Sequence, residues 1–317
     1  MENSIAILGL AIVAFAALTY VRARKVETRI TQLYPAIGTL VPVQKGVIHA
    51  LQRGTGRDVV LLHGALANLR DFPEDLVSEL AKSYRVTLMD RPGCGYTSGL
   101  KRIATAKAQA TALAQAADAL GLRAPIVVGH SYGATVAAAW ALCGSSLPVR
   151  PAALVLIAGP LMPASVALGG LRVLAKSATL RHLSSYLAAA WTPRRVMRFM
   201  IGEAFAPEPV GPEYAKRSGA RLALRRSSFR ANARQTSILA PLLKQLAAEL
   251  PRLELPVELI HGSEDRVVPC AAHSVAAAKL IRGARLTVLS GRGHMPHHTE
   301  PQAVIEAISR AALALPA

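Results

Sequence analysis

One short stretch places a serine where its hydroxyl could act as a nucleophile. Residues 125–136 read Pro-Ile-Val-Val-Gly-His-Ser-Tyr-Gly-Ala-Thr-Val, so a β-branched apolar run ends at a glycine and a helix-permissive run follows. The pattern predicts a strained strand-to-helix turn with Ser131 at its tip, flanked by Gly129 and Gly133 because a Cβ at either position would clash with the strand or the helix. The N-terminus of that helix would offer free N–H groups to an oxyanion. Ser131 is therefore predicted to be catalytic.

A serine hydroxyl is a poor nucleophile at neutral pH and needs an adjacent base, which a carboxylate must in turn orient. Both residue types follow apolar runs downstream: Glu264 and Asp265 in one loop, and His294 in the Gly-Arg-Gly-His segment after the next run. The order Ser, Asp, His, each after a predicted parallel strand, places all three at the carboxyl edge of one sheet.

The elements needed to build that sheet alternate along the chain. An edge strand is expected at 47–53. Helices are expected over 71–82 and 103–119, near 271–282 and from about 301 onward. The run at 58–62 is continuously apolar after Asp58, as expected for a strand buried on both faces. Further strands are expected at 85–89, 126–129, 153–158, 257–260 and 285–289. This alternation predicts an α/β fold with a mainly parallel sheet covered by helices on both faces.

The alternation lapses between residues 160 and 250. This segment reads as helical, carries fourteen Lys and Arg against four Glu, and is interrupted by prolines at 163, 193, 207, 209, 212 and 241. We interpret it as a helical cap inserted into a core formed by 47–159 and 251–317. The basic cap is either a solvated helical face or a surface resting on anionic lipid headgroups, with apolar residues between the arginines of 194–200 and 221–234.

The first residues predict a membrane anchor. Residues 3–21 carry no charge, and a helix of that length spans about 28 Å, close to the hydrocarbon thickness of a bilayer. A secretory signal peptide is the alternative, but the segment lacks a basic start and a small-residue cleavage site. The basic residues that follow, up to Arg29, place the catalytic domain on the cytoplasmic side. Residues 1–29 are thus expected to be an anchor with a basic flank, and 30–46 a linker.

The apolar fraction of 52% and the small share of charged residues, 18%, exclude a disordered chain. The net charge of +18 favours an anionic membrane surface or nucleic acid as partner, but no nucleic-acid-binding motif is present. Three widely spaced cysteines form neither a disulfide framework nor a metal cluster. No metal-ligand spacing and no dinucleotide motif occurs, so we expect no metal and no cofactor.

Five motifs together resemble the α/β-hydrolase family, over roughly residues 46–317. They are His-Gly at 63–64, Asp-Arg-Pro-Gly-x-Gly at 90–95, Gly-His-Ser-Tyr-Gly at 129–133, Gly-x-x-Asp-x-x-Val-Pro at 262–269 and Gly-x-Gly-His at 291–294. Within the family, the architecture of the chain resembles that of membrane-anchored serine esterases similar to monoacylglycerol lipase. Family members that are haloalkane dehalogenases or epoxide hydrolases carry aspartate at the position of Ser131, so the resemblance does not favour those activities.

The resemblance implies Ser131 as nucleophile, His294 as base and Asp265 as the acid that orients it. It implies the backbone N–H groups of Ala65 and Tyr132 as the oxyanion hole. The motif residues His63 and Gly64 would support that loop, as Gly129 and Gly133 support the serine.

Several other residues are weighed against these roles. Glu264 is the rival for the acid, and His63 could be a second base but more often braces the oxyanion loop. Asp90 is expected to fix the Arg-Pro-Gly turn. His297 and His298 are expected at the rim or facing solvent, and the remaining histidines are taken as structural: His49, His130, His182, His261 and His273.

The sequence thus predicts a membrane-anchored serine hydrolase that cleaves carboxylic esters, most simply acyl lipids, through an acyl-serine intermediate. The same triad would also permit acyl transfer or amide cleavage. A ligand-binding or signalling protein that retains the fold but hydrolyses little is the alternative from a different class.

Overall fold

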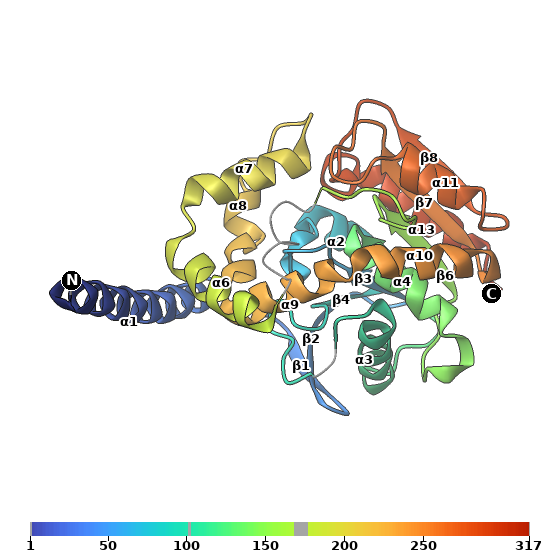
Figure 1. Cartoon of the computed structure of the whole chain (residues 1–317). Coiled ribbons are helices and arrows are strands. Elements are labelled where there is room, and N and C mark those ends of the chain that lie inside the picture. The colour runs from blue at the N-terminus through green and yellow to red at the C-terminus, as the bar shows by residue number, and fades with distance from the viewer. Residues whose placement is uncertain (1, 101–102, 168–176, 317) are drawn as a thin grey trace.

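The computed structural model describes residues 2–100, 103–167 and 177–316, and it contains one eight-stranded sheet (Figure 1). The strand order is β1-β2-β4-β3-β5-β6-β7-β8, in which β1, β2 and β4 pair antiparallel and all other pairs are parallel. The strands are β1 (Thr39–Val43), β2 (Gly46–Arg53), β3 (Arg57–Leu62), β4 (Tyr84–Met89), β5 (Ile126–His130), β6 (Ala153–Ile157), β7 (Val257–Gly262) and β8 (Arg285–Leu289).

Helices cover both faces of this sheet. Helices α2 (Glu74–Leu80) and α13 (Pro301–Leu313) pack on one face, and α3 (Ala106–Ala119), α4 (Tyr132–Leu142) and α10 (Leu239–Glu249) pack on the other. Strands β5 and β6 are buried along their whole length, which explains the apolar runs at 126–128 and 153–157. The predicted α/β fold with a mainly parallel sheet is confirmed.

The N-terminal helix extends beyond the expected anchor and its basic flank, and part of the expected linker is a strand. Helix α1 (Glu2–Leu33) continues without a break through the basic flank, because arginine and lysine are good helix formers. After it, β1 adds an outermost strand to the sheet, and Pro42 is tolerated there because an edge strand need not donate every N–H. Residues 30–46 are therefore not an irregular linker, and the predicted edge strand at 47–53 is the second strand.

The cap comprises α6 (Ala178–Trp191), α7 (Arg194–Phe205), α8 (Tyr214–Arg217) and α9 (Arg226–Ser237). Part of the predicted insertion, residues 168–176, lies outside the described residues. Helix α10, which was expected to end the cap, instead belongs to the core. Its buried leucines at 239, 243 and 246 form an apolar stripe that packs with α4, so the core resumes well before residue 251.

Two other predicted helices are shorter than expected. The helix expected over 71–82 is divided into the 3₁₀ turn η1 (Leu69–Asp71) and α2, because Pro73 provides the N-cap from which α2 starts. The helix expected near 271–282 is a π-turn (Ala271–Val275) followed by the short α11 (Ala276–Ala278).

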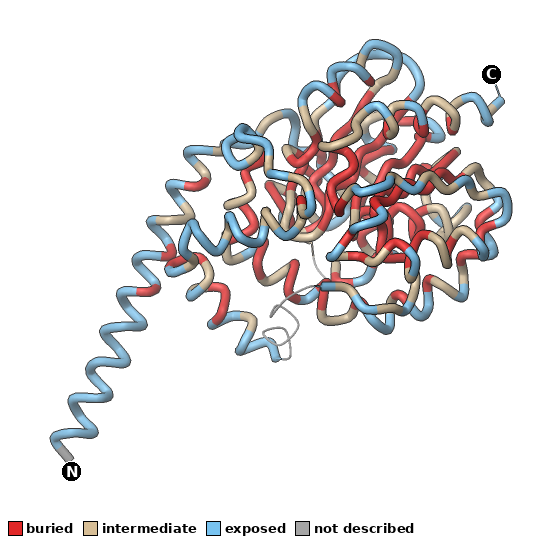
Figure 2. Tube along the Cα trace, turned by 90° about the horizontal axis from the view of Figure 1, so that it is seen from above, coloured by how far each residue is buried: buried red, intermediate tan, exposed pale blue. Residues whose placement is uncertain are grey.

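Helix α1 is attached to the cap through its C-terminal half, while its N-terminal half projects from the body with its side chains exposed (Figures 1 and 2). Arg22 donates to the carbonyl of Ala190 at 2.7 Å and lies over the ring of Trp191. Glu27 forms an ion pair of 2.9 Å with Arg226 of α9. The second half of α1 is therefore part of the folded domain.

Candidate active site

Ser131 occupies the turn between β5 and α4, and its backbone is strained. Its φ is 52° and its ψ is −124°, a region that residues with a Cβ rarely adopt. The amide of Ser131 donates to the carbonyl of Ile157 on the neighbouring strand at 2.8 Å, which holds the turn in place. A Cβ on Gly129 would overlap the backbone of Gly133, and a Cβ on Gly133 would overlap the backbone of Leu62. Glycine is required at both flanks for this reason.

The structure brings the three predicted residues into one hydrogen-bonded series. His294 Nε2 lies 3.0 Å from Ser131 Oγ, and His294 Nδ1 lies 2.7 Å from Asp265 Oδ2. Because a carboxylate only accepts, Nδ1 carries the proton and the lone pair of Nε2 faces the serine hydroxyl. This is the tautomer that a general base needs.

Asp265 is held as a carboxylate by donors on both oxygens. The amides of Val267 and Val268 donate to Oδ1 at 2.8 Å each, and His261 Nε2 lies 2.9 Å from Oδ2. Burial alone would raise the pKa of Asp265, but the charges and hydrogen bonds of His294 and His261 outweigh it and hold this pKa below its usual range. The rival Glu264 is exposed.

His261 is a functional neighbour that sequence reasoning treated as structural. It ends the apolar part of β7, four residues before Asp265, and is fully buried. Its Nδ1 lies 2.6 Å from Ser274 Oγ, so the ring is fixed while Nε2 points at the Asp265 carboxylate. The signal that could have found it is a histidine at the carboxyl end of a buried strand with a carboxylate four residues on.

The predicted oxyanion-hole amides lie beside the serine. A Cβ built on Gly64 would be only 3.0 Å from Ser131 Cβ, so the 63–65 backbone passes directly over the nucleophile. Neither the amide of Ala65 nor that of Tyr132, the first residue of α4, has a hydrogen-bond acceptor among the described residues. Two free donors next to a serine hydroxyl are suited to binding a developing negative charge.

His63 does not contact the triad residues through a hydrogen bond. Its Nδ1 donates to the carbonyl of Gly64 at 2.8 Å, and its Nε2 accepts from the amide of Arg91 at 3.0 Å. Burial, followed by the nearby guanidinium of Arg91, lowers the pKa of His63 to about 4, so the ring is neutral at pH 7. It braces the oxyanion loop from behind.

Arg91 is a buried cation that the sequence reading overlooked inside the Asp-Arg-Pro-Gly motif. Its guanidinium donates to the carbonyls of His63 and Gly64 at 2.8 Å each and to the side chains of Gln109 and Gln235. It also lies 4.7 Å from the ring centre of Tyr132. One side chain therefore fixes the oxyanion loop against α3, α4 and the cap helix α9.

Asp90 has a different set of partners from the triad acid. It accepts from the amides of Leu69 and Tyr96 at 2.7 and 2.8 Å and lies 2.6 Å from His49 Nδ1. These contacts fix the Arg-Pro-Gly turn and the start of η1.

The expectation that His297 and His298 lie at the rim or in solvent is wrong. His297 is fully buried, and His298 is half-buried with its Nε2 donating to the carbonyl of Asp71 at 2.7 Å. The short helix α12 (Pro296–Thr299) turns these rings inward after His294. Both rings lie beside Asp71, which is more than two hundred residues earlier in the chain.

The cap contacts both loops that form the site. Asn232 of α9 accepts from the amide of Leu66 at 2.9 Å, and Glu208 accepts from the amide of Gly293 at 2.9 Å. The first bond holds the oxyanion loop and the second holds the loop of His294. The cap is thus hydrogen-bonded to both loops of the site.

Known proteins are similar to this chain in sequence or in fold. A non-heme chloroperoxidase from Streptomyces lividans is 27% identical over 256 residues, covering 78% of this chain and 88% of that protein. A pimeloyl-[acyl-carrier protein] methyl ester esterase from Stenotrophomonas maltophilia is 29% identical over 276 residues, covering 78% and 90%. The solved structure of a membrane phospholipase A, described as a bacterial virulence factor, superposes with a TM-score of 0.69 at 22% identity, over 98% of this chain and 99% of that one.

The profile of the alpha/beta hydrolase family matches residues 59–307, which include the serine turn, the Asp265 loop and His294. With the sheet order and the hydrogen-bonded series already described, this match identifies the chain as a member of the α/β hydrolase family.

Proposed function

We propose that this α/β hydrolase is a membrane-anchored serine hydrolase that cleaves carboxylic esters, with acyl lipids as substrates, through an acyl-Ser131 intermediate. The observation that carries the proposal is the series Ser131–His294–Asp265 beside two backbone amides that have no acceptor in the described part of the chain. The named esterase among the relatives supports an ester bond as the target.

In the first half of the reaction, Ser131 Oγ attacks the ester carbonyl carbon while His294 Nε2 removes the hydroxyl proton. The carbonyl oxygen becomes an oxyanion, which the amides of Ala65 and Tyr132 bind. The C–O bond to the leaving alcohol then breaks as His294 returns its proton to that oxygen. Asp265 stabilises the transient imidazolium and keeps the ring in place.

In the second half, water attacks the acyl-serine carbonyl carbon and gives its proton to His294 Nε2. Collapse of the second tetrahedral intermediate breaks the bond to Ser131 Oγ, which recovers the proton from His294. The product is the free carboxylic acid. Product analysis with and without a competing alcohol or amine acceptor separates hydrolysis from acyl transfer, and parallel assays of amide substrates test amide cleavage.

Helix α1 supports the membrane anchor. It is long enough to cross a bilayer, with a mean hydropathy of 2.3 over its most apolar window. The attachment of its C-terminal half to α6 and α9 favours an anchor over a cleaved signal sequence, because cleavage would remove packed residues of the domain. The basic residues from Arg22 to Arg29 favour a cytoplasmic catalytic domain.

The cap exposes apolar side chains on α6, which contacts α1, and on α7, which follows it. Leu183 on α6 and Phe199 on α7 are 56% and 67% exposed, and the exposed arginines 194, 195 and 198 lie on α7 with Phe199. Phe15 of α1 stacks on Trp191 at the end of α6. An exposed apolar face with a basic margin, joined to an apolar anchor, suits contact with anionic lipid headgroups and the acyl boundary.

Aspartate at both Leu183 and Phe199 is expected to weaken hydrolysis of acyl lipids in anionic vesicles by about 10-fold or more, because two charges would have to enter the interface. Hydrolysis of a short, water-soluble ester should stay near the wild-type rate. The matched control is Leu313→Asp, since Leu313 is 85% exposed on α13 at the other end of the molecule from α1 (Figure 1). Equal losses on both substrates, or equal losses in the control, would contradict contact through α6 and α7.

Replacing Arg91 with methionine is expected to lower kcat for ester hydrolysis by about 10²-fold with a smaller change in KM. The carbonyls of His63 and Gly64 lose their common donor, so the Ala65 amide no longer stays aligned with the oxyanion, and losing one such donor costs about that much. Lysine should not rescue the variant because it cannot reach four acceptors in one plane.

The matched control for Arg91 is Arg85→Met. Arg85 also pairs through a fork of hydrogen bonds, to Asp58 at the opposite edge of the sheet. Both variants should lose stability in thermal melts, whereas only the Arg91 variant should lose kcat. Similar kcat values for the two variants would remove Arg91 from the positioning of the oxyanion loop.

A further inference from the structure

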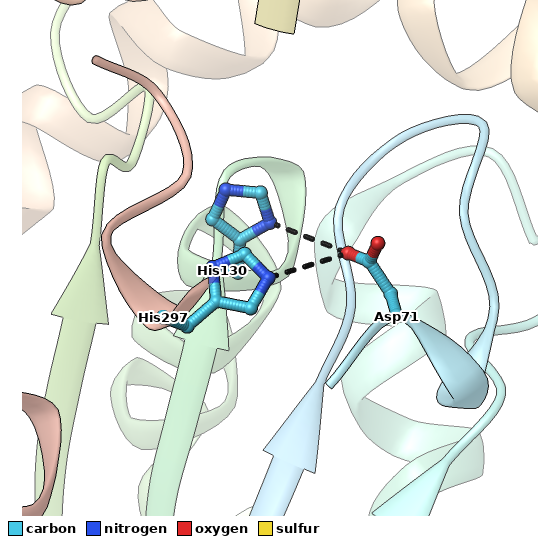
Figure 3. A group of neighbouring side chains, drawn as sticks. All are labelled: Asp71, His130 and His297. Carbon is cyan, nitrogen blue, oxygen red and sulfur yellow. Dashed lines mark ion pairs between the residues drawn. The ribbon is translucent and has the colours of Figure 1, made fainter. Parts of the chain in front are cut away.

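Three side chains beyond the triad meet in a buried cluster directly behind it. Asp71 comes from η1, His130 is the last residue of β5, and His297 lies on α12 (Figure 3). Their relative exposures are 2%, 3% and 0%, so water does not solvate them freely. Figure 3 shows both imidazole rings turning a nitrogen toward the same carboxylate oxygen of Asp71.

The cluster leaves ring nitrogens without hydrogen-bond partners. His130 Nδ1 lies 3.8 Å from Asp71 Oδ2, and His297 Nε2 lies 3.6 Å from the same oxygen, both beyond hydrogen-bond distance. Among the described residues, neither nitrogen has any other partner. A buried polar atom without a partner is costly, so these two nitrogens need an explanation.

A hydrogen bond at the other ring nitrogen fixes the tautomer of His130. Its Nε2 lies 2.9 Å from the backbone carbonyl of His294, and a carbonyl only accepts, so Nε2 carries the proton. In the neutral ring the lone pair of Nδ1 then faces the Asp71 carboxylate. Burial, followed by the charges of His297 and His294, lowers the pKa of His130 well below its usual value, which favours this neutral form.

Asp71 contributes the negative charge. Burial would raise its pKa, but its interactions with the nearby histidines, first of all His297, outweigh that effect and hold this pKa below its usual range. Its other oxygen, Oδ1, accepts from the Tyr214 hydroxyl at 2.7 Å, which fixes the group and leaves Oδ2 directed at the rings. An anion, the lone pair of His130 Nδ1 and an unpartnered ring nitrogen of His297 thus converge on one point.

The separations match those around a small metal ion. Ligand atoms about 2.1 Å from a tetrahedral centre lie about 3.4 Å from one another, near the 3.6 and 3.8 Å found here. All three candidate ligand atoms lie within 4.8 Å of one another. We propose that Asp71 Oδ2, His130 Nδ1 and His297 Nε2 form a binding site for one divalent transition-metal ion, with zinc the ion that best fits two imidazoles and a carboxylate.

Such an ion holds together the segments that carry the active site. His130 directly precedes Ser131, His297 lies three residues after His294, and Asp71 lies in η1 after the oxyanion loop. The bond from His130 to the His294 carbonyl serves as the outer-shell contact that orients a metal-ligating ring. The site is structural, since the ion is buried behind the triad, and it is independent of the proposed ester substrate.

The test uses the full-length protein in detergent, stripped with a chelator and titrated with Zn²⁺ by calorimetry, with the bound metal counted by mass spectrometry. We expect one zinc per wild-type chain. We also expect a melting temperature raised by roughly 5 °C or more when zinc is about 100-fold above its dissociation constant. Asp71→Asn and His297→Gln should bind at least about 100-fold more weakly, since even second-shell changes cost 10- to 100-fold.

Two controls locate the ion. His182→Gln removes an exposed cap histidine, and His294→Gln removes the triad histidine; both should keep stoichiometric zinc. No zinc on the wild type, binding unchanged in the two cluster variants, or binding lost with His294→Gln would each overturn the site.

A measurement on the wild type alone keeps the proposal testable if the cluster variants fail to fold. Co²⁺ in place of zinc should give the intense visible absorption of a four-coordinate site with nitrogen and oxygen ligands. X-ray absorption at the zinc edge should show imidazole scattering from two rings. A spectrum of six oxygen ligands in either experiment contradicts the site.

Discussion

Alanine at position 131 is expected to lower kcat for ester hydrolysis by at least about 10⁴-fold while leaving KM close to the wild-type value. The hydroxyl that forms the acyl-enzyme is lost, whereas the oxyanion amides and the binding surface remain and sustain only a weak residual reaction. Fluorophosphonate labelling should disappear at the same time, because the reagent needs the Oγ that lies 3.0 Å from His294 Nε2. Steady-state kinetics and gel-based labelling of the purified protein check both effects.

The matched control is Ser146→Ala, which removes a hydroxyl from an exposed turn at the end of α4. That variant should label and turn over like the wild type. A Ser131→Ala protein that still labels, or still hydrolyses esters at a comparable rate, would contradict the serine mechanism. The folded state of the variant can be verified by its melting temperature.

The serine turn could be predicted because its constraints are local. A β-branched run, a glycine on each side of Ser131 and a small-residue run specify a strand, a tight turn and a helix, and the structure has β5, the turn and α4 at these positions. The triad partners followed from strand order, since loops after parallel strands share one edge of the sheet. Asp265 could be preferred to Glu264 because of the family pattern, and burial separates the two in the structure.

The boundaries of α1 and the cap could not be predicted because they depend on contacts distant in sequence. Arg22 looked like the end of a membrane segment, yet it packs on Trp191 of α6, and the helix continues to Leu33. The leucine stripe of α10 is visible in the sequence. Its assignment to the core or the cap depends on α4, which lies a hundred residues earlier.

The surroundings of the histidines near the site could not be predicted. His297 was expected at the rim or in solvent and is buried, whereas His130 and His261 were expected to be structural and are buried beside partners that the sequence did not identify. A histidine side chain is equally compatible with solvent, a buried hydrogen bond or a ligand, so its type alone carries little information. The partner of each ring follows only from its position relative to Asp71 or Asp265 in the folded chain.

Asparagine at position 265 is expected to lower kcat by about 10⁴-fold, because it would give His294 the wrong tautomer. Two backbone amides already donate to one oxygen of this group, so that end must remain the amide oxygen. The NH₂ then takes the place of Oδ2 and donates to His294 Nδ1, which forces the ring proton onto Nε2. A protonated Nε2 cannot remove the Ser131 proton.

The neighbouring Glu264→Gln is the control for this change, since it alters one carboxylate to an amide at an exposed side chain one residue away. It should retain the wild-type kcat, and both variants should fold, because asparagine and glutamine preserve shape. Asp265→Asn also changes the partner of His261, because His261 Nε2 lies 2.9 Å from the same Oδ2 atom. If Asp265→Asn kept its kcat and Glu264→Gln lost it, the orienting acid would have to be reassigned and the hydrogen bond of 2.7 Å to His294 would have no catalytic meaning.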